Sequence, residues 1–160
     1  MSWNRLISAK RLGMEAYHDP RKHVRSTFQR DYDRMIFSSP FRRLQNKTQV
    51  FPLPGSIFVH NRLTHSLEVS SVGRSMANAV SEILLERHGD RPWAAKLLDL
   101  GDITATACLC HDLGNPPFGH GGEKTISTFF SEGAGLELKP LLTARQWADL
   151  IHFEGNANSF

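Results

Sequence analysis

The longest regular pattern in the sequence runs from Thr64 to Arg87. Its apolar residues recur every three or four positions, which is the spacing of one face of an α-helix. These residues are Leu67, Val69, Val72, Met76, Ala79, Val80, Ile83 and Leu84. A helix of this length with one apolar stripe is expected to turn that stripe toward a core. Gly89 to Pro92 ends the pattern, because proline cannot continue a helix.

The rest of the chain predicts shorter helices and little strand. The predicted helices cover residues 31–37, 40–45, 102–111, 122–130 and 140–151. The segment 102–111 is apolar on nearly all sides, so we expect it to be buried. Residues 131–139 contain glycine and predict a loop. Two β-rich runs separated by a Pro-Leu-Pro-Gly turn predict a minor β-hairpin near 48–59. The predicted fold class is therefore all-α with this one hairpin.

Length and composition are those of one globular domain. The chain has 160 residues, of which 40% are hydrophobic and 22% charged, which excludes a disordered or fibrous protein. No apolar run approaches the ~20 residues that a membrane span needs. Cys108 and Cys110 are too few and too close for a disulfide framework. A reducing cytoplasm is therefore the expected location.

Charge is distributed unevenly along the chain. Residues 1–50 carry a net charge of +7, whereas residues 51–160 carry −4. A basic arm before a mildly acidic body indicates an anionic partner, such as a nucleotide, a nucleic acid or an acidic subunit. A solvated, partly disordered arm is the alternative. We expect a basic N-terminal segment over 1–40 and a helical domain over 41–160.

A histidine and an aspartate stand together at the polar end of the apolar segment, at His111 and Asp112. A buried carboxylate is costly unless a cation lies beside it. Imidazole and carboxylate are both good ligands for divalent metals, so the pair indicates a metal site. In the alternative interpretation Asp112 caps the following turn and His111 packs in the core.

Other polar residues extend this interpretation. His65 lies at the start of the long helix, and Arg62 precedes it by one turn with a guanidinium suited to phosphate oxygens. His120 and Glu123 are three residues apart at a helix start, so their side chains can meet. Glu123 could instead serve only as a capping residue. The glycines around His120 leave open space, as a substrate would require.

In combination these motifs resemble the HD-domain metal phosphohydrolases, and more narrowly the deoxyguanosine triphosphate triphosphohydrolases (dGTPases) and their SAM-and-HD-domain relatives. The matching segments are RRLQNKTQVFPLPGSIFVHNRLTHSLEVSSVGRSMA at 42–77, HDLGNPPFGHGGE at 111–123 and FEGNAN at 153–158. The opening WNRLISAKRLG also resembles the start of the family. The resemblance covers about residues 40–160 and implies an HD-domain helical fold.

The resemblance also implies roles for individual residues. His65, His111 and Asp112 match three of the family's four metal ligands. His120 matches the active-site histidine, and Glu123 the carboxylate that acts with it. The substrate-binding positions that match are Arg62 for phosphate, Gln49 for the deoxyribose or base side, and Asn156, with Glu154, in the segment that lines the cleft.

One position departs from the family pattern. The fourth ligand is an aspartate that the resemblance places beyond Phe160, and Asp149 stands in the wrong context to replace it. The chain therefore resembles the N-terminal portion of a longer enzyme. The metal is Mn, Mg, Fe or Zn, since a His/His/Asp set suits each of them.

The expected reaction is hydrolysis of a deoxynucleoside triphosphate, with dGTP favoured, to a nucleoside and tripolyphosphate. The alternatives are another HD-domain nucleotide phosphohydrolase, or a catalytically silent fragment that binds nucleotide or single-stranded nucleic acid. The resemblance implies a homo-oligomer and a single-stranded DNA effector, and the lack of a long apolar run predicts no membrane partner.

Overall fold

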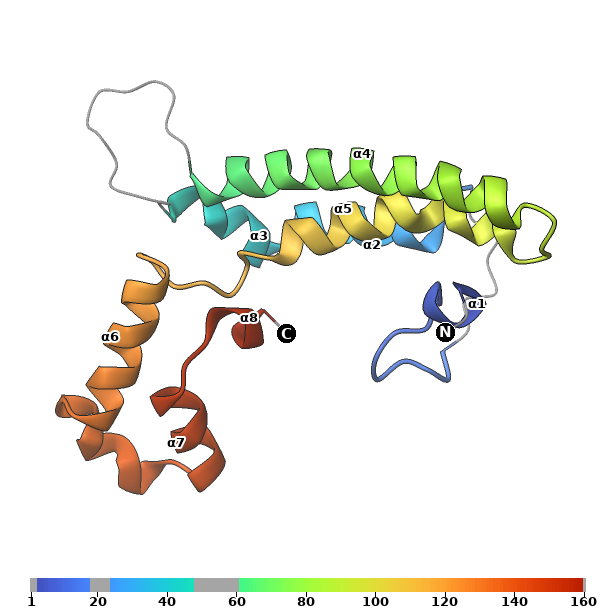
Figure 1. Cartoon of the computed structure of the whole chain (residues 1–160). Coiled ribbons are helices and arrows are strands. Elements are labelled where there is room, and N and C mark those ends of the chain that lie inside the picture. The colour runs from blue at the N-terminus through green and yellow to red at the C-terminus, as the bar shows by residue number, and fades with distance from the viewer. Residues whose placement is uncertain (1–2, 18–23, 48–60, 160) are drawn as a thin grey trace, which may run out of the picture. The chain divides into compact units, whose positions relative to one another are not determined.

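The computed structural model describes residues 3–17, 24–47 and 61–159, and every regular element within these ranges is a helix (Figure 1). The α-helices are α1 (Trp3–Leu6), α2 (Thr27–Phe37), α3 (Ser39–Arg43), α4 (Arg62–His88), α5 (Leu100–Cys110), α6 (His120–Ser131), α7 (Ala144–Ile151) and α8 (Gly155–Asn158). The 3-10 helices are η1 (Leu44–Asn46), η2 (Ala94–Asp99) and η3 (Ala134–Leu141). The all-α fold class is confirmed, and the hairpin predicted near 48–59 lies outside the described residues.

Helix boundaries follow capping residues that the sequence already contains. The helix α2 begins at Thr27, four residues before the predicted start, because Ser26 and Gln29 form a reciprocal capping box. The predicted helix at 140–151 is wrong in its first part. Pro140 lies in η3, and a second capping box between Thr143 and Gln146 starts α7 at Ala144. The loop predicted at 131–139 is likewise wrong, since η3 occupies much of it.

The chain divides into two compact units. The first consists of residues 1–38 and 67–109, and the second of residues 39–66 and 110–160. Each unit is described here by itself.

The first unit is held together by the serine face of α4. Ser70 Oγ donates to the Ala105 carbonyl at 2.9 Å, and Ser81 Oγ donates to the Leu97 carbonyl at 2.7 Å. Small side chains let the backbones of the facing helices approach closely, and each buried hydroxyl gains a hydrogen bond. Arg74 forms an ion pair with Asp102 on α5 and lies over the Tyr32 ring of α2.

The apolar stripe of α4, predicted to face a core, is exposed within the described part of this unit. Its members Leu67, Val72, Met76, Val80 and Ile83 are exposed, whereas Ser70 retains only 2% of its accessible surface. The hydrogen bonds of the serines determine which face is buried. The expected burial of the segment 102–111 holds only for Asp102, Ala105 and Leu109, and Ala107 is exposed.

The second unit combines an aromatic cluster with the segments that contain the candidate site residues. Phe130 of α6 lies edge-on to Phe129 and to Trp147 of α7, with ring centroids 5.1 and 6.2 Å apart. Figure 1 shows α6, η3 and α7 together in orange and red. Phe41 and Leu44 are buried in α3 and η1.

Within the described ranges, no helix combines the length and the apolar character that crossing a bilayer requires.

Exchanging side-chain types between the two faces of α4 tests this packing. In the 160-residue chain, we expect Ser70→Val to lower the free energy of unfolding by about 1–3 kcal/mol, because it overpacks a close contact and removes a buried hydrogen bond. Val72→Ser, at a position 59% exposed, should change it by less than about 0.5 kcal/mol. Urea denaturation measures both. A larger loss for Val72→Ser would show that the apolar stripe is the buried face.

Candidate metal and proton-transfer site

The first turn of α4 places two of the predicted site residues on one side of the helix. Asn61 caps this end: its Oδ1 accepts a hydrogen bond from the Thr64 amide at 2.9 Å. The helix therefore begins at Arg62, so Arg62 and His65 are three residues apart on the same face.

Three predicted ligands meet at the end of α5 and the start of α4. One donor atom from each of His65, His111 and Asp112 lies within 4.8 Å of the other two. The two imidazole rings are edge-on, with centroids 5.2 Å apart. The structure thus brings together all three residues that the resemblance assigned to the metal.

The Asp112 carboxylate is almost completely buried, and its two oxygens have different surroundings. Oδ1 forms an ion pair with Arg62 Nη1 at 2.8 Å and accepts a hydrogen bond from Asn115 Nδ2 at 2.6 Å. Oδ2 lies 3.5 Å from His111 Nε2. One oxygen is thus held by two donors, while the other points toward the imidazole cluster.

This arrangement fits a divalent metal. Ligands of one ion lie about 3–4 Å apart when metal–ligand bonds are about 2.1 Å, so these three groups need only small side-chain rotations. Hydrogen bonds to the oxygen that does not face the cluster are the outer support that metal-binding carboxylates usually have. His65, His111 and Asp112 could therefore hold a divalent ion, and the donor types do not select which one.

The two cysteines take no part in this cluster. Among the described residues, the group that could hold a metal contains only His65, His111 and Asp112. Cys108 and Cys110 are half-buried, and burial raises the pKa of the Cys110 thiol. A protonated thiol is a poor metal ligand.

Lys47 supports the turn that follows the His-Asp pair, and the sequence analysis missed it. Its Nζ donates to the carbonyls of Asn115 at 2.8 Å and Leu113 at 3.4 Å, and its own carbonyl accepts from the Arg62 amide at 3.1 Å. Burial lowers the pKa of Lys47, as do the charges of Arg62 and Arg43, while Asp112 opposes them. The only signal in the sequence was its place in the KTQVF motif beside Gln49.

A strained turn immediately precedes His120, which is the first residue of α6. Phe118 and Gly119 have φ angles of 67° and 55°, in the left-handed region that glycine tolerates and phenylalanine rarely adopts. Such strain tends to persist where the surrounding structure requires it, often at functional sites. An added Cβ on Gly121 would meet nothing within 4 Å, in keeping with the open space expected around His120.

His120 and Glu123 form a close pair. His120 Nδ1 lies 2.7 Å from Glu123 Oε2. The His120 side chain is 98% exposed, whereas that of Glu123 is 13% exposed. The hydrogen bond to Glu123, and then the charge of Glu123, raise the pKa of His120. The same hydrogen bond, followed by one from the Gly155 amide, lowers the pKa of Glu123.

The FEGNAN segment lies beside this pair through its backbone. The Gly155 amide donates to Glu123 Oε1 at 2.8 Å. Asn156, predicted to bind substrate, donates from its side-chain amide to Glu154 at 2.8 Å. The structure thus places Asn156 next to the pair without testing its role. Gln49 lies outside the described residues.

The fold and these residues together define a known class of domain. The chain matches the HD domain family over residues 62–145, and it belongs to that family. This range contains Arg62, the three residues of the metal cluster and the His120–Glu123 pair.

Three relatives carry a more specific name. The chain is 46% identical over 160 residues to a deoxyguanosinetriphosphate triphosphohydrolase-like protein of Pseudomonas aeruginosa, and 45% identical over 162 residues to one of Synechocystis. These alignments cover all of this chain but 35% and 36% of the relatives. A deoxyguanosinetriphosphate triphosphohydrolase of Yersinia enterocolitica is 38% identical over 183 residues, covering 96% of this chain and 36% of the relative. The chain spans about a third of the length of these relatives.

The geometry of the His120–Glu123 pair predicts an altered titration. The NMR-measured pKa of His120 should lie above that of a free histidine, and Glu123→Gln should bring it back down. The ion pair is complete only between the lowered pKa of Glu123 and the raised pKa of His120. Its contribution to stability is therefore lost as pH rises through the His120 pKa, or falls through the Glu123 pKa. An unchanged His120 pKa in Glu123→Gln would contradict the pairing.

Proposed function

We propose that the complete protein is a metal-dependent deoxynucleoside triphosphate triphosphohydrolase that converts dGTP and water to deoxyguanosine and tripolyphosphate. The observation that carries this proposal is the presence, in one compact unit, of the His65–His111–Asp112 cluster and the exposed, carboxylate-paired His120. The names of the relatives support the choice of substrate.

We propose His65, His111 and Asp112 as ligands, together with a further carboxylate from beyond Phe160. A divalent ion at such a site neutralises phosphate charge and lowers the pKa of water. Arg62 and Asn115 keep the Asp112 carboxylate in place, with Oδ2 on the side of the imidazoles.

His120 is the proposed proton-transfer group. Attack of water on the α-phosphorus forms one P–O bond and breaks the bond to the 5′-oxygen, which must gain a proton. Glu123 holds Nδ1 of the imidazole, so Nε2 remains to donate that proton, and the raised pKa keeps the ring protonated over a wider pH range. Hydrogen-bonded Glu123 also fixes the orientation of the ring.

Substrate contacts are proposed for Arg62, Gln49 and Asn156. Support for Arg62 comes from its Nε, which is buried and has no hydrogen-bond partner among the described residues. A phosphate oxygen would satisfy this donor, while Nη1 remains on Asp112. For Gln49 and Asn156 the support is the motif resemblance alone.

The oligomeric state, the location, the domain division and the identity of the metal are supported by fewer observations. We propose a homo-oligomer in the cytoplasm, with an oligomeric interface supported by the exposed apolar stripe of α4. The domain division at residues 40 and 41, and the choice among Mn, Mg, Fe and Zn, stay predictions.

A product-resolved assay tests the proposed reaction. The complete protein, incubated with dGTP and Mn²⁺, should release tripolyphosphate, as measured by anion-exchange separation of the phosphates. The His111→Ala/Asp112→Ala variant should release none and should lose bound Mn²⁺, because it lacks two of the ligands. His152→Ala, at an exposed position of the same unit, is the matched control and should retain both. Orthophosphate or pyrophosphate as product would instead indicate another HD-domain nucleotide phosphohydrolase.

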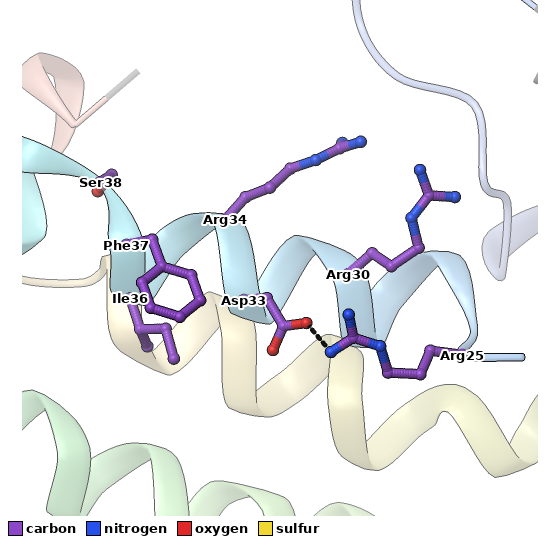
Figure 2. Close-up of a pocket in the computed structure, with 7 residues that line it drawn as sticks. All are labelled: Arg25, Arg30, Asp33, Arg34, Ile36, Phe37 and Ser38. Carbon is purple, nitrogen blue, oxygen red and sulfur yellow. Dashed lines mark hydrogen bonds and ion pairs between the residues drawn. The ribbon is translucent and has the colours of Figure 1, made fainter. Parts of the chain in front are cut away.

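A second proposal concerns anion binding in the first unit. An open, shallow pocket of about 690 Å³ lies along α2, and Figure 2 labels Arg25, Arg30 and Arg34 among its lining residues, with Phe37 near the end of the helix. Arg25 forms an ion pair with Asp33. Arginines together with an exposed aromatic ring suit single-stranded nucleic acid, because arginines bind its phosphates and the ring can stack on its bases. We propose this pocket as the binding surface for a single-stranded DNA effector.

Salt dependence tests that surface. Binding of a fluorescent oligonucleotide should weaken steeply as salt rises, and Arg30→Gln/Arg34→Gln should weaken it further and reduce the slope of log K against log salt by about 0.7 per lost phosphate contact. Fluorescence anisotropy measures both. Lys139→Gln, a cation of the second unit, serves as control. An affinity that is independent of salt, or that is equal in Arg30→Gln/Arg34→Gln and Lys139→Gln, would exclude this surface as the binding site.

A further inference from the structure

Gly155 lies between two polar side chains of the candidate site. It is buried, and a Cβ built on it would lie 2.0 Å from Asn115 Oδ1 and 2.9 Å from Glu123 Oε1. Any other residue at this position must therefore displace one or both of these side chains. The close approach of the backbone is the reason for glycine here.

On one side of Gly155 stands the proton-transfer pair. The Gly155 amide donates to Glu123 Oε1 at 2.8 Å, while Oε2 of the same carboxylate lies 2.7 Å from His120 Nδ1. The two oxygens of Glu123 are thus assigned to two different partners. A carboxylate held at both oxygens cannot rotate away from the imidazole without breaking a hydrogen bond.

On the other side stands the support of the metal cluster. Asn115 donates from Nδ2 to Asp112 Oδ1 at 2.6 Å. The Asn115 carbonyl is fixed in turn by Lys47. Displacing the Asn115 side chain would remove one of the two donors that hold Asp112 Oδ1.

The direction of the Gly155 amide is itself fixed. Glu154 caps α8, and its carboxylate accepts from the amides of Asn156 at 3.1 Å and Ala157 at 2.8 Å. In the same segment, Asn158 Nδ2 donates to the Gly114 carbonyl at 2.9 Å, and Ser159 Oγ accepts from the Gly114 amide at 2.9 Å. The segment is therefore anchored to the turn after Asp112 by the side chains of Asn158 and Ser159.

We propose that Gly155 is a positioning residue that fixes two parts of the site relative to each other. It positions the proton-transfer group His120 through Glu123, and it positions the ligand Asp112 through Asn115. The inference rests on the proposed function for its catalytic meaning, but its geometry does not depend on the substrate. Gly155 touches no reacting atom in this scheme and acts through its neighbours.

Gly155→Ala in the complete protein tests the proposal with two measurements made without substrate. The NMR-measured pKa of His120 should fall toward that of a free histidine, because the methyl group displaces Glu123. Glu123, Glu154 and Arg62 are the charged groups that act on His120, and only the Glu123 geometry is altered directly. The affinity for Mn²⁺, measured by calorimetry, should fall about 10–100-fold as Asn115 releases Asp112.

Kinetics provide a third measurement. For the hydrolysis of dGTP, kcat should fall about 10–100-fold while KM changes by less than about threefold, since the displaced groups act on proton transfer more than on binding. The pH dependence of kcat should shift in the direction of the lowered His120 pKa. Ala144→Gly, a change of one methyl group at the exposed first position of α7, is the matched control and should leave all values unchanged.

A second pair of variants distinguishes the proposed effect from simple misfolding of Gly155→Ala. In Asn115→Ala the side-chain atoms nearest to a Cβ on residue 155 are absent, so the added methyl group disturbs only Glu123. The His120 pKa should still fall between Asn115→Ala and Asn115→Ala/Gly155→Ala. An equal His120 pKa in these two variants, or wild-type values of both pKa and Mn²⁺ affinity in Gly155→Ala, would overturn the proposal.

Failure of the proposed function is distinguishable from failure of this inference. If the wild-type protein releases no tripolyphosphate while Gly155→Ala still lowers the His120 pKa and the Mn²⁺ affinity, the reaction is wrong and the positioning role stands. If the wild-type protein is active and Gly155→Ala matches it in all three measurements, the positioning role is wrong.

Discussion

The buried carboxylate of Asp112 is the group on which the candidate site depends. A charge with so little exposure is tolerated only when its partners are in place, and removing one partner of such a pair costs about 3–5 kcal/mol. Those partners are Arg62, at the first position of α4, and Asn115, in the turn beyond α5. This one carboxylate therefore joins the first turn of α4 to the turn that follows α5.

The proximity of the candidate site residues could be predicted from sequence because their motifs are local. His111 and Asp112 are neighbours, Arg62 and His65 are one turn apart, and so are His120 and Glu123. Helical spacing places each of the last two pairs on one face of a helix, and the structure shows His120 in contact with Glu123. The boundaries of α2 and α7 were equally readable, since both begin at capping boxes that were present in the sequence and overlooked.

The buried face of α4 could not be predicted from hydropathy. Apolar residues favour burial, but a face of small hydroxyl side chains allows closer packing and satisfies backbone carbonyls of the facing segments. Ser70 and Ser81 do this across 35 and 16 residues of sequence, and no local pattern encodes either partner. The stripe of larger apolar residues on the same helix carries the stronger pattern and faces outward.

Two supports of the site were missed for the same reason. Lys47 contacts a turn 66 to 68 residues away, and Gly155 donates to a carboxylate 32 residues away. A lysine and a glycine are common residues with many ordinary roles. Their contribution here is visible only from their hydrogen bonds to residues distant in the chain, which the sequence does not reveal.

The contrast in exposure within the His120–Glu123 pair has a consequence for how protons are supplied. Glu123 is held inside, whereas nearly the whole imidazole of His120 stands in solvent. A ring in that position exchanges protons directly with bulk water and dissolved buffer, so the proton transfer proposed for His120 requires no internal chain of donors among the described residues. The protein has to fix the orientation of the ring, and the surrounding solution can restore its proton.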